Sequence, residues 1–280
     1  NLNQARSQGA VNTSGASVNA GMIAGGNKYS PGASYTAVEQ YNGTSWTEIA
    51  EINTSRGYST GAGTQTAMLK VSGITSGSAS ARAEVESWNG SSWTEITDVN
   101  TATTQAGGAG TQTAALKFGG EGGDAKTEFW NGSSWTEVND LNDGRTQNSG
   151  GGTSTSAITA GGNSPPRTTN TETWDGTSWT EVNNLNTARE GGNMMAANAT
   201  AGVLAGGRSH PSYYTQTEDW NGTSWTEVAD LSTVVYNGSS SGSATSGWVA
   251  GGIASAPTQP AATQEWEVPS AVQVKTVTIS

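Results

Sequence analysis

Hydrophobic and polar positions follow one motif that recurs along the whole chain. The motif is a glutamate, a spacer, an aromatic residue, Asn-Gly or Asp-Gly, two hydroxyl residues, and then Trp-Thr-Glu with an aliphatic residue. Five copies are complete and a sixth, around Trp266, is degraded. The leading aromatic residues are 42 to 47 positions apart: Tyr41, Trp88, Trp130, Trp174, Trp220 and Trp266. This spacing is that of a four-stranded propeller blade.

A second landmark precedes each copy by about fifteen residues. It is a short apolar run that ends in paired glycines, as at 157–162, although the run at 69–73 keeps only one glycine of the pair. A segment rich in Gly, Ser and Thr comes before it. We therefore expect four strands per repeat: a small-residue inner strand, a buried apolar strand, the Glu-x-aromatic strand, and an outer Trp-Thr-Glu strand. The Asn-Gly pair predicts a hairpin turn, because both residues accept positive φ.

These strands predict an all-β fold, a single six-bladed β-propeller spanning 1–280 with four antiparallel strands per blade. The expected blades are 1–53, 54–100, 101–142, 143–186, 187–232 and 233–280. The β-branched segment 272–280 is the candidate for the last outer strand, and the alternative is that it continues into a neighbouring domain. Because the chain begins inside a motif, at Asn1-Leu2-Asn3, we expect a fragment or a processed product.

The amino-acid composition argues against a disordered chain and against several classes of binding partner. Only 32% of the residues are hydrophobic and the net charge is −11, but eleven Trp supply large apolar surfaces that a disordered chain lacks. The acidic balance disfavours nucleic acid and anionic membrane surfaces as partners. No stretch approaches the ~20 apolar residues of a membrane span, so membrane insertion is not expected. The chain has no cysteine, and therefore no disulfide and no thiolate metal site.

The paired glycines that end a hydrophobic strand, the Glu-x-aromatic-Asn/Asp segment and the following Trp together resemble the kelch repeat. The aliphatic-to-Arg segments, such as 185–189, resemble the kelch connection between blades. The loop between the last two strands departs from that pattern, since it is shortened to Asn-Gly-Ser/Thr-Ser. The low-complexity style of the repeats is also similar to kelch-type repeat proteins of marine viruses. The resemblance implies a propeller whose loops carry recognition.

Little catalytic chemistry is visible. The single histidine, His210, excludes a transition-metal site built from several His, and we expect no metal and no cofactor. The glutamates of the repeat occupy equivalent positions in five copies, which favours a structural role over a catalytic pair. The same reasoning makes the repeated Trp packing groups.

Candidate binding residues come from positions where repeats differ, because loops on a rigid scaffold carry recognition. The loops between the second and third strands of each blade diverge most, and the fifth, at 208–216, has the composition of a binding loop. Arginines also recur at the connections between blades. They either ring the mouth of the axial channel and bind a carboxylate or sulfate, or brace neighbouring blades. The candidates are Arg208, His210, Tyr213, Tyr214, Tyr29, Arg167, Arg6, Arg56, Arg145 and Arg189.

The sequence favours a non-enzymatic recognition or structural module, extracellular or on a virion, that binds a glycan or protein receptor through this loop face. Other virion proteins, as in a phage tail fibre, are further candidate partners. Two alternatives remain open. One is a glycan-active lyase or hydrolase on the same scaffold, and the other is an intracellular kelch-type adaptor, since a cytoplasmic location is not excluded.

Overall fold

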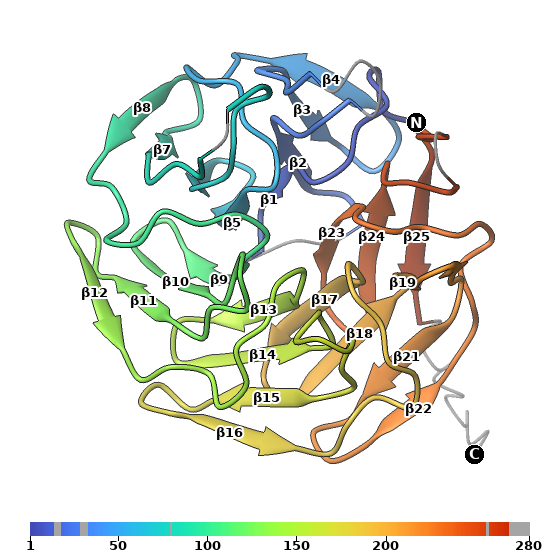
Figure 1. The fold of residues 1–280 in the computed structure, drawn as a ribbon. Helices are drawn as coiled ribbons and strands as arrows, with labels where there is room; N and C mark the ends of the chain where they lie inside the picture. Colours follow the sequence, from blue (N-terminus) through green and yellow to red (C-terminus); the bar gives the residue numbers. More distant parts are fainter. Residues whose placement is uncertain (14–17, 29–32, 79, 256–257, 269–280) are drawn as a thin grey trace, which may run out of the picture.

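The computed structural model describes residues 1–13, 18–28, 33–78, 80–255 and 258–268. It is a six-bladed β-propeller in which six antiparallel sheets surround one axis (Figure 1). The inner strands are β1 (Ala10–Val11), β5 (Thr60–Thr64), β9 (Gly107–Thr111), β13 (Ser149–Thr153), β17 (Asn193–Asn198) and β23 (Ser239–Gly242). The second strands are β2 (Gly21–Ala24), β6 (Ala67–Val71), β10 (Ala114–Phe118), β14 (Ser156–Ala160), β18 (Ala201–Ala205) and β24 (Ser246–Ala250).

The third strands are β3 (Val38–Tyr41), β7 (Val85–Trp88), β11 (Thr127–Trp130), β15 (Thr171–Trp174), β21 (Thr217–Trp220) and β25 (Thr263–Glu267). The outer strands are β4 (Trp46–Ile49), β8 (Trp93–Ile96), β12 (Trp135–Val138), β16 (Trp179–Val182) and β22 (Trp225–Glu227). A two-stranded ribbon, β19 (Arg208–Ser209) and β20 (Ser212–Tyr213), projects from blade five. The fold prediction is therefore confirmed, with four strands in five blades and three described strands in blade six. The predicted outer strand at 272–280 lies outside the described residues.

The inner strands close the ring. Each contacts the inner strands of the blades on either side, and β23 contacts β1, which joins the two ends of the chain (Figure 1). Leu2 continues this junction, because its amide donates to the carbonyl of Ala261 at 2.8 Å. Small residues make the close approach possible: a Cβ added to Gly108 would lie 2.8 Å from the carbonyl oxygen of Gly61 in the preceding blade.

The core lies between the blades and is built on the tryptophans. Within a blade the two aromatic residues face each other across the outer hairpin, as Trp88 and Trp93 do at 5.4 Å between ring centroids. Both also pack on the preceding blade, where they meet Met22, Val38 and Ile52. The repeated Trp are thus buried packing groups rather than exposed sugar platforms.

The hairpin turn differs from the prediction in one respect. Among the described turn residues, only the glycines have positive φ, for example Gly43 at 89°. The asparagine instead accepts from the backbone with its side chain: Asn42 Oδ1 receives the amides of Thr44 and Ser45 at 3.0 and 2.9 Å. This Asx turn explains Asn or Asp at the position without requiring left-handed backbone there.

Candidate functional site

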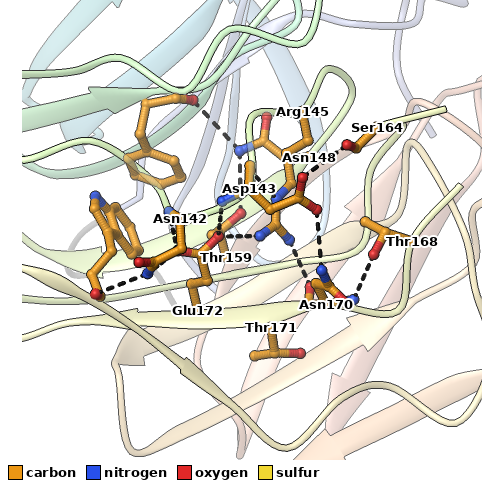
Figure 2. Close-up of polar contacts among 12 residues, drawn as sticks. Asn142, Asp143, Arg145, Asn148, Thr159, Ser164, Thr168, Asn170, Thr171 and Glu172 are labelled. Carbon is orange, nitrogen blue, oxygen red and sulfur yellow. Dashed lines mark hydrogen bonds and ion pairs between the residues drawn. The ribbon is translucent and has the colours of Figure 1, made fainter. Parts of the chain in front are cut away.

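The arginines at the blade connections are buried in ion pairs. In blade four, Arg145 donates to Glu172 and to the carbonyl of Asn170 (Figure 2). It also donates to the carbonyl of Gly161. The other oxygen of Glu172 receives the backbone and side-chain N–H groups of Asn142 at 2.7 and 2.9 Å. We call such a set of Arg, Glu and Asn a clasp.

Four blades contain a complete clasp. The sets are Arg6, Glu39 and Asn3; Arg56, Glu86 and Asn53; Arg145, Glu172 and Asn142; and Arg189, Glu218 and Asn186. Each connection also binds the blade before it, because the arginine carbonyl accepts from the second glycine of that blade's pair. In this way Arg189 accepts from the amide of Gly162 at 2.8 Å. A Cβ on the first glycine, Gly161, would lie 2.5 Å from the same oxygen.

The clasp geometry favours the bracing interpretation of these four arginines. Their side chains are at most 1% exposed, and their guanidinium groups point into their own blades rather than into the channel mouth. Burial lowers the pKa of Arg6 and Arg189, while the neighbouring Glu39 and Glu218 act in the opposite direction. We therefore do not count these arginines among the ligand contacts.

The channel mouth is instead formed by residues two positions beyond the arginines. Six residues with left-handed backbone, at φ between 53° and 61°, occupy equivalent places: Gln8, Tyr58, Gln105, Gln147, Gly191 and Asn237. Each donates its amide to the carbonyl of the corresponding residue in the preceding blade at 2.8–3.1 Å, and Gln8 closes the circle by donating to Asn237. We call this closed circle of six backbone hydrogen bonds the mouth ring.

Below the mouth ring lies a polar cavity of about 130 Å³. Its wall consists of the ring residues and of residues on or next to the inner strands, most of them with small or polar side chains, such as Ser59, Ser149 and Ser239. The described residues of the wall are all uncharged, so this part of the channel offers hydrogen bonds but no charge to a ligand.

One side of the mouth departs from the sixfold repeat by gathering two arginines. Glu190, between Arg189 and the ring residue Gly191, accepts at one oxygen from Arg208 Nε at 2.8 Å and from Arg167 Nη2 at 3.0 Å. Glu190 is 1% exposed, whereas Arg208 and Arg167 are 24% and 28% exposed. Two cations thus share one anion, which leaves a positive patch on a chain of net charge −11.

Two tyrosines complete this patch. Arg208 lies over the ring of Tyr236 at 4.0 Å, and Tyr213 meets the same ring edge-on at 6.0 Å. Tyr236 donates its hydroxyl to the side chain of Gln147 in the mouth ring at 2.8 Å. Burial raises the pKa of Tyr236 to about 12, so its phenol stays neutral at physiological pH. Burial by itself would lower the pKa of Arg208, but the bond to Glu190 and the nearby Tyr236 outweigh it and raise that pKa.

The rim cluster is our name for Arg167, Glu190, Arg208, Tyr213 and Tyr236. Three of its members, Arg208, Tyr213 and Arg167, were predicted from sequence. His210 lies at the exposed tip of the β19–β20 ribbon, and Tyr214 covers the buried Arg189 at 5.7 Å instead of joining the cluster. Tyr29 lies outside the described residues.

Sequence reasoning missed Glu190 and Tyr236. Both stand one position after the residue at the clasp arginine's place, where the other repeats have Ser7, Gly57, Thr104 and Thr146. When the six repeats are aligned, a charged residue and an aromatic residue therefore stand at a position that is otherwise occupied by small residues. This difference between repeats was the signal that could have found them.

The described part of the chain was found to differ from a metalloprotein or a helical membrane protein in its residues. It contains no group of three or more His, Cys, Asp or Glu that could hold a metal ion. None of its segments forms a helix able to cross a bilayer. No model of a known protein family matches the chain, and a search of curated proteins found no relative.

Proposed function

We propose that this propeller is a non-catalytic recognition module that binds an acidic glycan at the rim cluster, on the surface of a cell or virion. The proposal rests on one observation: the face where the repeats diverge carries two partly exposed arginines beside the half-buried ring of Tyr213. A guanidinium binds a carboxylate or sulfate through paired N–H groups, and an aromatic ring offers a flat apolar surface to a sugar. The kelch-like motifs support the same use of the face.

The contacts within the rim cluster leave this capacity free. Glu190 engages Arg208 through Nε and Arg167 through Nη2. Arg167 Nε is buried, so the Nη groups of Arg208 and Nη1 of Arg167 are the donors that we assign to a ligand. Because Glu190 fixes both side chains from below, little conformational entropy is lost when an anion binds. Tyr236 is buried beneath Arg208 and its pKa is raised to about 12, so it supports Arg208 rather than abstracting a proton from a ligand.

A glycan array with carboxylated, sulfated and neutral glycans tests this function. We expect the acidic glycans to bind without product formation, and Arg208→Ala to weaken binding about tenfold or more. Arg82→Ala is the matched control, because Arg82 is also a half-exposed arginine of a loop on this face, paired with Glu84 in blade two. It should leave glycan binding unchanged. Turnover of the glycan, or equal losses from both substitutions, would contradict the proposal.

A further inference from the structure

Two positions of the repeat lie side by side beneath the mouth ring. One directly follows the ring residue, and the other is on the second strand, three places before the glycine that ends the apolar run. In blade one, a Cβ added to Gly9 would lie 2.5 Å from Cγ2 of Ile23. In blade four the same positions carry Asn148 and Thr159, whose side chains are hydrogen-bonded at 3.1 Å.

Blade two alone places a serine and a lysine at these positions. The six pairs are Gly9 and Ile23, Ser59 and Lys70, Ala106 and Lys117, Asn148 and Thr159, Gly192 and Leu204, and Gly238 and Val249. Lys70 Nζ lies 2.8 Å from Ser59 Oγ. Ser59 is half-buried and lines the channel cavity, whereas Lys70, on β6, is fully buried. The serine is thus open to a ligand in the channel, and the lysine is shielded from solvent.

The surroundings of Lys70 suit a neutral amine. Its Nζ lies 3.2 Å from the carbonyl oxygens of both Ala24 and Arg56. A neutral amine has two N–H groups for these two carbonyls, which leaves its lone pair for the hydroxyl of Ser59. That hydroxyl also lies 3.0 Å from the carbonyl oxygen of Ser72, and by rotating it can direct its proton to either acceptor.

The charges around Lys70 also favour the neutral form. Burial, followed by the nearby Arg56, lowers the pKa of Lys70 well below its ordinary value. Glu86 raises this pKa and Arg6 lowers it further, but both effects are smaller than that of burial. No carboxylate of the described residues forms an ion pair with Lys70. Burial and a neighbouring cation are the usual means by which a lysine becomes a base near neutral pH.

The cavity beside Ser59 has room for a small group and offers it hydrogen-bond donors. Its volume is about 130 Å³, and its described wall is uncharged. Gln8 and Gln105, the ring residues of the two adjacent blades, line it. Their Oε1 atoms accept from Asn27 at 3.2 Å and from Thr146 at 2.7 Å, respectively. Their Nε2 groups remain to donate to an oxyanion.

We infer that Ser59 and Lys70 act as nucleophile and general base in the hydrolysis of esters of a small, uncharged acyl group. This inference goes beyond the proposed glycan recognition, whose site is the rim cluster, and shares no residue with it. Lys70 Nζ removes the hydroxyl proton while Ser59 Oγ bonds to the ester carbonyl carbon. The carbonyl oxygen becomes an oxyanion, for which we assign Gln8 and Gln105 as donors.

The cycle closes without any further reactant than water. The bond from the carbonyl carbon to the alcohol oxygen breaks, and the Lys70 ammonium gives its proton to that oxygen. Water then attacks the acyl-serine, and Lys70 takes the proton of the water and returns it to Ser59 Oγ as the acid leaves. The net reaction converts the ester and water to an alcohol and a carboxylic acid.

The inference is tested with the full chain and p-nitrophenyl acetate, whose hydrolysis releases a coloured phenolate. We expect turnover that Ser59→Ala and Lys70→Met each lower about a hundredfold or more. Ser240→Ala is the matched control, because Ser240 is also half-buried and lines the cavity but donates to the carbonyl of Met194 at 3.0 Å. His210→Ala removes the exposed imidazole, which could attack this ester by itself. Both controls should keep the full rate.

A pH profile separates a reacting pair from a structural hydrogen bond. The rate should rise with one ionisation and level off below about pH 10.4, the ordinary pKa of lysine, because only neutral Lys70 accepts the proton. Tyr58→Phe removes the one titratable side chain in the described cavity wall and should leave this profile unchanged. Acid quenching during turnover should trap an acetyl group on Ser59, detected by mass spectrometry.

Three results would overturn the inference. They are a wild-type rate no higher than that of Ser59→Ala, a Lys70→Met variant that keeps the wild-type rate, and a rate that His210→Ala abolishes. Each would show that the bond between Ser59 and Lys70 only stabilises the blade, as the bond between Asn148 and Thr159 does. Glycan binding at the rim cluster is measured separately on the array, so its success or failure does not depend on these results.

Discussion

Blades four and six share their first three strands but differ at the clasp. In blade four, Glu172 is buried with Arg145 and Asn142. In blade six all three places carry other residues: Gln264, Val235 and Ser232. Gln264 accepts from the amide and hydroxyl of Ser232 at 2.8 and 2.7 Å, so the neutral pair is also hydrogen-bonded. Compared with blade four, blade six therefore lacks both the buried anion and the buried cation.

Blade three offers an intermediate case. Thr103 replaces the clasp arginine, but Glu128 remains buried and is paired instead with Lys117 on β10 at 3.1 Å. Every buried glutamate of the clasps thus keeps one cation, from whichever strand supplies it. The physical reason is that an unpaired buried charge costs several kcal/mol, whereas a neutral set of similar volume costs little. The comparison of the blades shows that a buried glutamate is present only where a cation pairs with it, and that both are replaced together.

The largest expected effect on stability comes from removing the arginine of one clasp while its glutamate stays. Arg145→Val leaves Glu172 buried without its cation, and we expect the free energy of unfolding to fall by about 3–5 kcal/mol. Adding Glu172→Gln and Asn142→Ser copies blade six into blade four and should recover most of the loss. Urea unfolding of the single and triple variants measures both values.

The triple variant separates charge compensation from simple packing. If the clasp stabilises the protein only through the arginine's contacts, the triple variant will be no more stable than Arg145→Val. That outcome would contradict the comparison between blades four and six.

The repeat made most of the fold predictable, because each strand's residues recur five or six times. Even the role of the glutamates followed from symmetry, since a group present in five blades belongs to the frame. The rim cluster was only half predictable. Arg208 and Tyr213 stand in a visibly divergent loop, but Glu190 gathers two arginines from different blades through contacts distant in sequence. The mouth ring was missed because left-handed backbone at Gln8 or Gln147 leaves no compositional sign comparable to glycine.

The next largest effect on stability concerns two lysines at equivalent places on neighbouring blades. Lys117 pairs with Glu128, whereas Lys70 donates to the carbonyls of Ala24 and Arg56 and to the hydroxyl of Ser59. We expect Lys117→Met to destabilise by about 3 kcal/mol, because Glu128 then lacks a cation. Lys70→Met should be neutral or stabilising by about 1 kcal/mol, because no carboxylate loses its partner.

A pH series sharpens this contrast. Burial, with the nearby Arg56, lowers the pKa of Lys70 well below its ordinary value. The unfolded chain therefore binds more protons than the folded one between the lowered pKa and about 10.4, and stability rises with pH in that window. The gain from Lys70→Met should accordingly be larger at pH 7 than at pH 10 in urea unfolding. An equal gain at both pH values would mean that Lys70 stays protonated in the fold.

The smallest effect concerns the clefts between neighbouring blades, in which the outer-strand tryptophans are packed. Trp179 and Trp225 donate their indole N–H to a threonine, but Trp135 meets Val85 at that place, and its buried Nε1 has no partner among the described residues. Val85→Thr should supply the missing acceptor and stabilise by about 1 kcal/mol, and Thr171→Val should cost a similar amount. Measuring both by urea unfolding tests whether the clefts are interchangeable. If Val85→Thr destabilises as much as Thr171→Val, the cleft between blades two and three is packed for an apolar wall, and the indole N–H there is satisfied by other means.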